Sequence, residues 1–414
     1  MTSLIRPFKG LRPVPERAVD VAAPPYDVLN TAEARERADS RPLSFLHISK
    51  PEIDLPDGTD PFAPEVYAKG AENLQRMIDE NVLVRDTAAS FYVYRLRMDG
   101  HEQEGLVFAA SIAEYDKNRI RRHELTQPYK EDDRVRQITA LNAQTGPVLL
   151  AYRSSAEVKA IIDAVVQEDP VYDLVTEDGI GHSLWVIDNF AQIEQLTRSF
   201  EEMDALYIAD GHHRTAAASR VAAARKKANP AHTGSEAYNY FLCVAFPHDE
   251  TRILDYNRVI RDLNDWRPEQ LLEQIEQRFE VMSSDAPVRP DRPAQFGMYL
   301  ENHWYRLDIR EKWIPVDDPV ARLDVNLLQD NLIGPLLGIE NQSTDSRIEF
   351  VGGVRGLEQL EKSVDSGDMR IAFSFFPTRM QDLMAVADAN EMMPTKSTWF
   401  EPKLADGLVT HVLD

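Results

Sequence analysis

Hydrophobic residues recur along the first part of the chain in two periods, one typical of strands and one of helices. Apolar and aromatic runs bounded by turn residues predict strands at residues 91–96, 105–112, 147–152, 182–188, 206–209 and 240–247. Helical spacing of apolar residues predicts helices at residues 31–40, 64–81, 156–166, 190–202 and 215–228. Asp99-Gly100 is a turn sequence between the first two strands, and Thr31 is the expected N-cap of the first helix. This mixture predicts an α+β or α/β fold.

The pattern weakens in the last third of the chain. It predicts a helix at 269–279, a hairpin at 295–309, a helix at 319–328, a βαβ-like piece over 350–375 and a helix at 380–390. The proline-studded opening, from Pro7 to Pro25, predicts extended chain with turns and no helix. We therefore expect a catalytic domain at residues 1–262 with an N-terminal extension. A C-terminal α/β region is expected at 263–414, with a tail that could return to the active site.

Composition narrows the class of protein. The 414 residues are 43% hydrophobic, and the formal net charge of −23 disfavours nucleic acid as a partner over most of the surface. No apolar run is long enough to cross a membrane, and the first residues, Met1 to Pro7, lack the apolar core of a signal peptide. Cys243 is the lone cysteine, which excludes an internal disulfide and a cysteine-rich zinc site. Together these features predict a cytoplasmic protein without a membrane segment.

The segment Ala209-Asp210-Gly211-His212-His213-Arg214 is the main candidate for chemistry. It joins a short apolar strand to an alanine-rich helix, so it forms a tight turn at a helix N-terminus. Such a terminus offers free backbone N–H groups and a positive dipole end, which stabilise an anion. Gly211 allows close backbone approach, Arg214 could clamp a phosphate, and the histidines can act as acid or base near neutral pH. We therefore predict a phosphate-binding turn.

The same turn has other interpretations. Asp210 could orient a histidine, hold a magnesium ion, or be a helix N-cap without any ligand. A zinc site made of Asp210, His212 and His213 is disfavoured, because adjacent histidines rarely point the same way and no other ligand motif accompanies them. The metal, if one is used, is left open.

A charged run over residues 119–136 centres on His123-Glu124. Glu124 among cations would stay ionised and could act as a general base, while Lys130, Arg134 and Arg136 could neutralise phosphate oxygens. A solvated helix with ion pairs between successive turns explains the same run equally well.

Two further segments attract attention by their residue types. Lys396-Ser397-Thr398 places polar donors beside Trp399-Phe400, and a strand that docks on the core is the competing interpretation. Pro24-Pro25-Tyr26-Asp27 is interpreted as a rigid structural turn.

Several segments together resemble the bacterial and archaeal family catalogued as domain of unknown function 1015. The resemblance rests on Pro7 to Pro13, Val21 to Val28, Arg122 to Thr126, Lys130 to Arg134, Ala209 to Arg214 and Pro394 to Phe400. These segments are spread from end to end, so the resemblance covers essentially the whole chain. Each of them alone is unspecific, and their combination is specific.

This family in turn is distantly similar to the ParB-like free serine kinases. The resemblance implies a ParB/sulfiredoxin-like mixed α/β core with an additional C-terminal α/β region. In those kinases a His-Glu pair supplies the catalytic base and an Asp-Gly-His-x-Arg turn binds the phosphate donor. The resemblance therefore implies that Glu124, with His123 and His212, is catalytic. It further implies a phosphate site made of Asp210, Gly211, His213, Arg214 and Thr215. This chain is longer than those kinases, its two motifs lie farther apart, and its C-terminal part has no counterpart in them.

The leading hypothesis is phosphoryl transfer to a small hydroxylated metabolite. Free L-serine is the best guess for the acceptor, with ATP, ADP or pyrophosphate as donor and Mg²⁺ as an accompanying ion. The chain lacks a Gly-x-x-x-x-Gly-Lys sequence, so it is not a P-loop enzyme. One alternative is a phosphoserine phosphatase that uses the same anion site. Another is a nucleotide- or phosphate-sensing regulator without turnover. The oligomeric state and the direction of reaction stay open.

Overall fold

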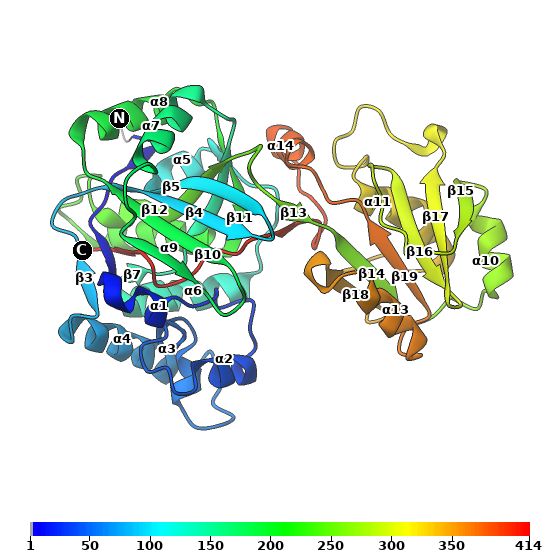
Figure 1. The fold of residues 1–414 in the computed structure, drawn as a ribbon, viewed down its shortest axis with the longest axis horizontal. Helices are drawn as coiled ribbons and strands as arrows, with labels where there is room; N and C mark the ends of the chain where they lie inside the picture. The colour runs from blue at the N-terminus through cyan, green and yellow to red at the C-terminus, as the bar shows by residue number, and fades with distance from the viewer. Residues whose placement is uncertain (1–2) are drawn as a thin grey trace. The chain divides into compact units, whose positions relative to one another are not determined.

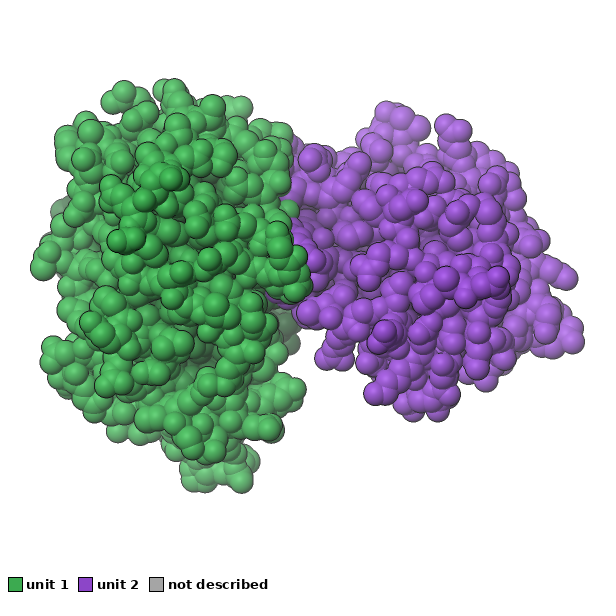
Figure 2. All heavy atoms as spheres, in the orientation of Figure 1, with its two compact units in different colours: residues 1–251, 402–414 green, residues 252–401 purple. Residues whose placement is uncertain are grey.

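The computed structural model describes residues 3–414, so Met1 and Thr2 of the N-terminal segment considered above lie outside the described residues. The chain divides into two compact units, which Figure 2 draws in different colours. Unit 1 is Met1–Thr251 with Pro402–Asp414, and unit 2 is Arg252–Glu401. The boundary expected at residues 262 and 263 therefore falls inside unit 2, and the end of the chain belongs to unit 1.

Unit 1 is built on a large mixed sheet, which has nine strands among the described residues. Its order is β6-β11-β8-β12-β5-β4-β10-β9, and β1 pairs with β5 beside this path. Pairings are antiparallel except β11 with β6 and β12 with β8. The strands are β1 (Ile5–Arg6), β4 (Phe91–Met98), β5 (His101–Ser111), β6 (Ile120–Arg121), β8 (Val148–Tyr152), β9 (Tyr172–Val175), β10 (Gly181–Ile187), β11 (Leu206–Asp210) and β12 (Tyr240–Pro247).

The central strands are those with the longest apolar runs. β12 is buried along its whole length, and β5 is buried from Gly105 onward, as expected for strands that are covered on both faces. Asp99 and Gly100 both adopt positive φ between β4 and β5. This backbone is typical of a two-residue hairpin turn, and the hairpin predicted at Asp99-Gly100 is confirmed. Cys243 lies within β12, fully buried, and its thiol donates to the carbonyl of Phe108.

Helices cover one face of this sheet and create the main core of unit 1. Residues of α7 (Ala156–Val165), α8 (Phe190–Glu201) and α9 (His212–Ala228) pack on alternate residues of the strands. α5 (Ile112–Asp116) and α6 (Pro128–Leu141) add further contacts, and α6 packs along α9. α7 and α8 lie together at one side of unit 1 (Figure 1).

A second core of unit 1 lies among α1 (Ala18–Val21), α2 (Thr31–Ala38), α3 (Leu46–Ser49) and α4 (Pro64–Asp79). Beside them a small sheet has the order β3 (Leu83–Arg85), β2 (Gly10–Pro13), β21 (Thr410–Val412) and β7 (Ala143–Gln144). The N-cap of α2 is Asn30 and not Thr31, because Asn30 and Glu33 form a capping box. The expectation of no helix in the opening segment was wrong at α1 and at the 3₁₀ turn Pro15–Arg17. Pro15 stands at the first helical position there, where a missing N–H is tolerated.

Unit 2 has its own six-stranded sheet within the described residues, in the order β15-β17-β16-β19-β14-β18. Its strands are β14 (Tyr256–Ile260), β15 (Phe279–Ser284), β16 (Gln295–Leu300), β17 (His303–Ile309), β18 (Ile348–Gly352) and β19 (Ile371–Phe375). A two-stranded ribbon joins β13 (Ile253–Leu254) and β20 (Trp399–Phe400). The helices are α10 (Pro268–Ile275), α11 (Asp324–Leu328), α12 (Gly334–Leu337), α13 (Glu358–Asp365) and α14 (Met380–Asp388).

The βαβ-like piece predicted over 350–375 is present in a split form. β18 and β19 each pair antiparallel with β14, so they run parallel to each other with β14 between them. The helix predicted at 319–328 begins later, at Asp324. Both units therefore mix helices and strands, as the sequence pattern predicts. In the described part of the chain, no helix is both long enough and apolar enough to span a membrane.

Candidate active site in unit 1

The turn between β11 and α9 has the backbone geometry expected of it. Gly211 adopts φ of 100° and ψ of 27°, a left-handed conformation that favours glycine. α9 begins at His212, three residues earlier than the helix predicted at 215–228. The first bond into this helix runs from the Thr215 N–H to the carbonyl of Gly211, at 3.0 Å. The preceding N–H groups of His212, His213 and Arg214 lie ahead of that bond, at the positive end of the helix.

Thr215 does not face this end of the helix. Its side chain is fully buried, and its hydroxyl donates to the carbonyl of Gly211 at 3.1 Å. Its hydroxyl is thus bonded within the helix, and a part of Thr215 in phosphate binding stays a prediction.

Arg214 and Asp210 form an ion pair across the turn. Nη2 of Arg214 donates to Oδ2 of Asp210 at 3.0 Å, and Nη1 donates to the carbonyl of Pro147. Burial would raise the pKa of Asp210, but Lys403 and Arg214 outweigh this and lower it to about 2. Asp210 is thus ionised at neutral pH. The N-cap residue of α9 is Gly211, so the interpretation of Asp210 as the N-cap is wrong. Two nitrogens of Arg214 thus bond within the protein, and its contact with phosphate stays a prediction.

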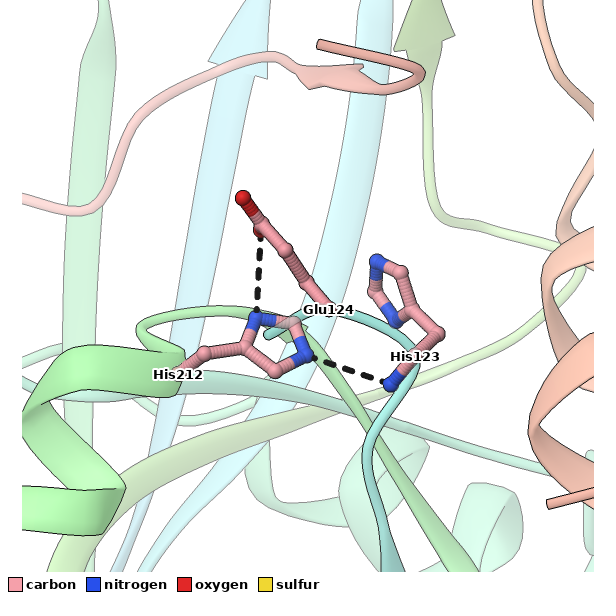
Figure 3. Close-up of side chains that lie close together, drawn as sticks. All are labelled: His123, Glu124 and His212. Carbon is pink, nitrogen blue, oxygen red and sulfur yellow. Dashed lines mark hydrogen bonds and ion pairs between the residues drawn. The ribbon is translucent and has the colours of Figure 1, made fainter. Parts of the chain in front are cut away.

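Glu124 lies in the loop between β6 and α6, next to His212. The distance from Nδ1 of His212 to Oε2 of Glu124 is 3.6 Å, and Nε2 of His212 accepts the backbone N–H of His123 at 3.4 Å (Figure 3). The two histidine rings meet edge to face with centroids 4.5 Å apart. Residues that are far apart in the sequence are thereby brought together, as the two motifs predict.

The hydrogen bonds determine the protonation of His212. Burial, with the neighbouring His123, lowers the pKa of His212 well below its usual value, so the ring is neutral at pH 7. Because Nε2 accepts an N–H, the single ring proton is on Nδ1, which faces Glu124. A neutral imidazole therefore presents an N–H dipole to the Glu124 carboxylate and orients it.

His123 is buried, and one of its two ring nitrogens has no hydrogen-bond partner among the described residues. A ring N–H donates to the carbonyl of Ile208, and burial lowers the pKa of His123 to about 4. Nδ1 is the nitrogen that has no hydrogen-bond partner among the described residues. His123 is therefore a neutral side chain held against β11, and its acidity does not suit it to proton transfer at neutral pH.

The three side chains of His123, Glu124 and His212 also satisfy the spacing of a metal site. Their candidate ligand atoms all lie within 4.8 Å of one another. Nδ1 of His212, however, carries the ring proton because Nε2 accepts an N–H, so Nδ1 has no lone pair to offer a metal. Two imidazoles and one carboxylate also do not match the all-oxygen preference of Mg²⁺. These residues therefore do not fit a resident Mg²⁺ ion in the geometry that they adopt.

His213 and Lys130 lie at the outer side of the turn. Nε2 of His213 accepts the backbone N–H of Gln127 at 3.0 Å, which ties the turn to the start of α6. Burial and the nearby Lys130 lower the pKa of His213, so this ring is also neutral at pH 7. Lys130 is exposed on the first turn of α6 and remains a candidate for contact with phosphate.

Arg134 has a structural environment that the sequence did not predict. It pairs with Asp133 and its guanidinium stacks on the ring of Tyr26, 3.8 Å from the centroid. The charged run is thus partly a structural helix: Arg220 of α9 pairs with Glu131 and Asp132 of α6. Arg134 thus contacts Asp133 and Tyr26 within the protein, and its part in phosphate binding stays a prediction.

A buried polar cluster that no sequence motif indicates lies behind the turn. Tyr26, Arg134, Arg214 and Asp406 line a cavity of about 30 Å³, and Oδ1 of Asp406 and Nε of Arg214 have no partner among the described residues. A cavity of this size holds one or two waters. Burial raises the pKa of Asp406 to about 7 and that of Tyr26 to about 12. The prolines before Tyr26 predict a rigid turn there, but no local sequence pattern indicates that Asp406 belongs to this cluster.

The tail candidates belong to unit 2. The carbonyl of Lys396 accepts from Nη2 of Arg258 at 3.0 Å, and its ammonium lies over the ring of Tyr256. Ser397 donates to the carbonyl of Pro394 and accepts, at its own carbonyl, from Thr378. Thr398 directly precedes β20. Their part in phosphate binding stays a prediction.

Comparison with known families decides the relationship of the chain. A family model described as "Protein of unknown function (DUF1015)" matches residues 5–326. The chain belongs to this family. No curated protein matches the DUF1015 chain.

Solved structures of low similarity to this DUF1015 member were also found. A free serine kinase in complex with AMP is 12% identical, covers 73% of this chain and 92% of its own, and has a TM-score of 0.34. SbnI with a C-terminal truncation from Staphylococcus aureus is 10% identical over 72% and 85%, with a TM-score of 0.36. A conserved hypothetical protein from Pyrococcus furiosus is 13% identical over 74% and 94%, with a TM-score of 0.33. At these TM-scores the likenesses do not establish an activity for the chain.

Proposed function

We propose that unit 1 catalyses phosphoryl transfer to the hydroxyl group of a small metabolite, with free L-serine as the acceptor and ATP, ADP or pyrophosphate as the donor. The observation that carries this proposal is the position of Glu124. Its carboxylate faces the N–H of a neutral His212, at the first residue of a helix whose N-terminus suits an anion. A base and an anion site are thus adjacent. The choice of serine comes from the resemblance of the two motifs to those of the serine kinases.

In the proposed reaction, the acceptor oxygen attacks the terminal phosphorus of the donor. The O–H proton passes to Glu124 while the bond from phosphorus to the leaving phosphate oxygen breaks. The N-terminal N–H groups of α9 and the exposed Lys130 stabilise the charge on the transferring group. His212 keeps Glu124 oriented, and Arg214 keeps Asp210 and the turn in place. Mg²⁺, where it is required, would be held largely by oxygen atoms of the donor phosphates.

Exposure of the groups supports catalysis over a purely structural role. The Glu124 side chain is 38% exposed, whereas His212, which orients it, is 3% exposed. A base must reach a substrate, and the group that orients it must not move. The ParB/sulfiredoxin-like description of the core and the cytoplasmic location stay predictions.

The test is the substitution Glu124→Gln in the full chain. We expect turnover of serine or phosphoserine with ATP, ADP or pyrophosphate, followed by phosphorus NMR, to fall by at least about 100-fold. Donor affinity, measured by calorimetry, should stay within about threefold of wild type, because Gln keeps the volume of the side chain. Glu65→Gln, at an exposed position of α4, is the matched control. A Glu124→Gln enzyme of wild-type activity would refute the base assignment.

The same screen separates the alternatives. Loss of phosphoserine without any nucleotide or pyrophosphate would identify a phosphatase. Donor binding without turnover of any pair would identify a sensing protein. Either result would overturn the kinase proposal while leaving the anion site in place.

A further inference from the structure

Unit 2 contains a cavity of about 200 Å³ that is not part of the site in unit 1. It lies between the loop before β16, the start of α11 and the start of α14, and every lining residue belongs to unit 2. An engineered cavity of about 150 Å³ is large enough for benzene. The volume in unit 2 therefore suits a small organic molecule, whereas the 30 Å³ cavity of unit 1 does not.

Asp324 lines this cavity, and one of its carboxylate oxygens has no hydrogen-bond partner among the described residues. Oδ1 accepts the backbone N–H of Ala294 at 2.8 Å, but Oδ2 is buried and has no partner in the described part of the chain. Burial raises the pKa of Asp324 to about 7, and the N–H of Ala294 and the nearby Arg379 only partly offset it. A buried polar oxygen without a partner is destabilising, and a donor group on a ligand would relieve it.

Ala294 gives an independent sign of a constrained site. It has φ of 65°, a left-handed conformation that residues with a side chain rarely adopt. Two hydrogen bonds hold it: its N–H donates to Asp324, and its carbonyl accepts the N–H of Ile309 at 3.1 Å. Backbone held in this way clusters at ligand-binding positions in proteins. The residue lines the same cavity.

A cation without a partner completes the cavity. Among the described residues, no side chain pairs with the guanidinium of Arg322, which is exposed and lines the cavity. The other guanidinium, that of Arg379, is bonded through two nitrogens to Asp382, both at 2.7 Å. Among the described side chains that line the cavity, the unpaired groups are thus one carboxylate oxygen and one guanidinium, and Leu327 and Phe376 contribute apolar walls.

We propose that this cavity binds a small zwitterion of the free α-amino-acid class. The ligand's ammonium pairs with Oδ2 of Asp324, and its carboxylate pairs with Arg322. A zwitterion satisfies both unpaired groups at once, whereas a simple amine or a simple carboxylate satisfies only one. The proposal does not depend on the chemistry of unit 1, because no residue of that site takes part.

The experiment is calorimetric titration of the full chain with glycine, L-serine, L-alanine and L-leucine. Ethanolamine, which lacks the carboxylate, and propionate, which lacks the ammonium, are the comparison probes. We expect at least one amino acid to bind with one-to-one stoichiometry, and both comparison probes to bind at least about tenfold more weakly. Asp324→Asn and Arg322→Ala should each weaken the amino acid by about tenfold or more.

Controls assign the binding to this cavity. Asp368→Asn and Arg370→Ala change exposed groups of unit 2 outside the cavity and should leave affinity unchanged. Glu124→Gln should also leave the affinity for the amino acid unchanged. If amino-acid binding is lost in Glu124→Gln and retained in Asp324→Asn, the binding belongs to unit 1 and the proposal is overturned. Because Arg322 is exposed, Arg322→Ala should fold normally. This variant therefore tests the proposal even if Asp324→Asn fails to fold. Absence of millimolar binding by any amino acid, or equal binding of ethanolamine, would also overturn it.

Discussion

At the scale of single residues, burial and charge oppose each other most clearly at Asp406. Its side chain is 1% exposed, and burial raises its pKa to about 7, although Arg214 and Arg134 act in the opposite direction. The folded state therefore keeps the Asp406 proton at pH values where the unfolded chain has released it. Folding stability falls as pH rises from about 4 to about 7 for this reason, and the loss is complete above pH 7.

The substitution Asp406→Asn tests this linkage. A difference of one in pKa corresponds to about 1.4 kcal/mol, and the pKa of Asp406 rises from 3.8 to about 7, so the variant should gain up to about 4 kcal/mol over wild type between pH 4 and pH 7. The measurement is urea unfolding of both proteins across this range. If the substitution only changes packing, the curves of unfolding free energy against pH differ by a constant. The linkage instead predicts that the two curves differ in slope between pH 4 and pH 7. Asp169→Asn, at an exposed position, is the control, and parallel curves for Asp406→Asn and wild type would contradict the linkage.

Single residues also mark the limit of sequence interpretation. The proximity of Glu124 to the turn that contains His212 was predicted from two motifs, His123-Glu124 and Asp210 to Arg214, taken together. Asp406 has no motif, and its neighbours Tyr26 and Arg214 are distant in sequence. Only the folded chain brings such groups together, so a pKa near 7 at Asp406 could not be predicted from local pattern.

At the scale of elements, the turn from β11 to α9 depends on Gly211 in two respects, its backbone conformation and its lack of a side chain. A Cβ atom on Gly211 would lie 3.1 Å from Nε and 3.2 Å from Cζ of Arg214. Its φ of 100° is also one that residues with a side chain rarely adopt. A substitution at this position therefore acts on the turn in two ways, through backbone strain and through the position of Arg214.

Gly211→Ala and Gly179→Ala separate these two effects. Gly179 has φ of 78°, but a Cβ there meets no atom within 4 Å. Both variants should lose about 1 to 2 kcal/mol of unfolding free energy from strain, measured in urea. Only Gly211→Ala should weaken binding of pyrophosphate or ADP, by about tenfold, in calorimetry. Unchanged affinity in Gly211→Ala would show that the turn does not bind the donor.

The elements of unit 1 were predicted well where an apolar pattern was strong. β12 was predicted with its observed bounds, and β11 and α8 to within a residue. The start of α9 was missed because His212, His213 and Arg214 carry no helical apolar period, and the conformation of Gly211 sets the boundary instead. In unit 2, α11 was predicted too long because Asp318 and Val320 form turns before it.

At the scale of the whole molecule, the two ends of unit 2 are adjacent in space. β13 and β20 pair antiparallel, with Ile253 opposite Phe400 and Leu254 opposite Trp399. The chain therefore leaves unit 1 and returns to it at one point, which is the arrangement of an inserted domain. No sequence pattern identified this insertion, because β13 and β20 are two-residue strands and lie far apart in the chain.

This arrangement makes unit 1 dependent on residues 402–414. Within them, β21 pairs with both β2 and β7, and Leu408, Val409 and Leu413 are buried. Burial of each such side chain stabilises by about 1.5 to 3 kcal/mol, so their joint loss approaches the whole stability of a typical domain. A chain that ends at Glu401 should therefore lose the folding of unit 1 and keep that of unit 2.

Differential scanning calorimetry and circular dichroism can test this dependence. We expect the chain of residues 1–401 to lose one cooperative transition and retain another, and the isolated fragment 252–401 to reproduce the retained one. Deletion of Asp414 alone is the control, because its ion pair with Arg85 is exposed and contributes at most about 1 kcal/mol. A 1–401 chain that melts like the full protein would contradict the dependence. Loss of both transitions would instead show that unit 2 needs unit 1 in order to fold, although its sheet, its core and its paired ends all lie within residues 252–401.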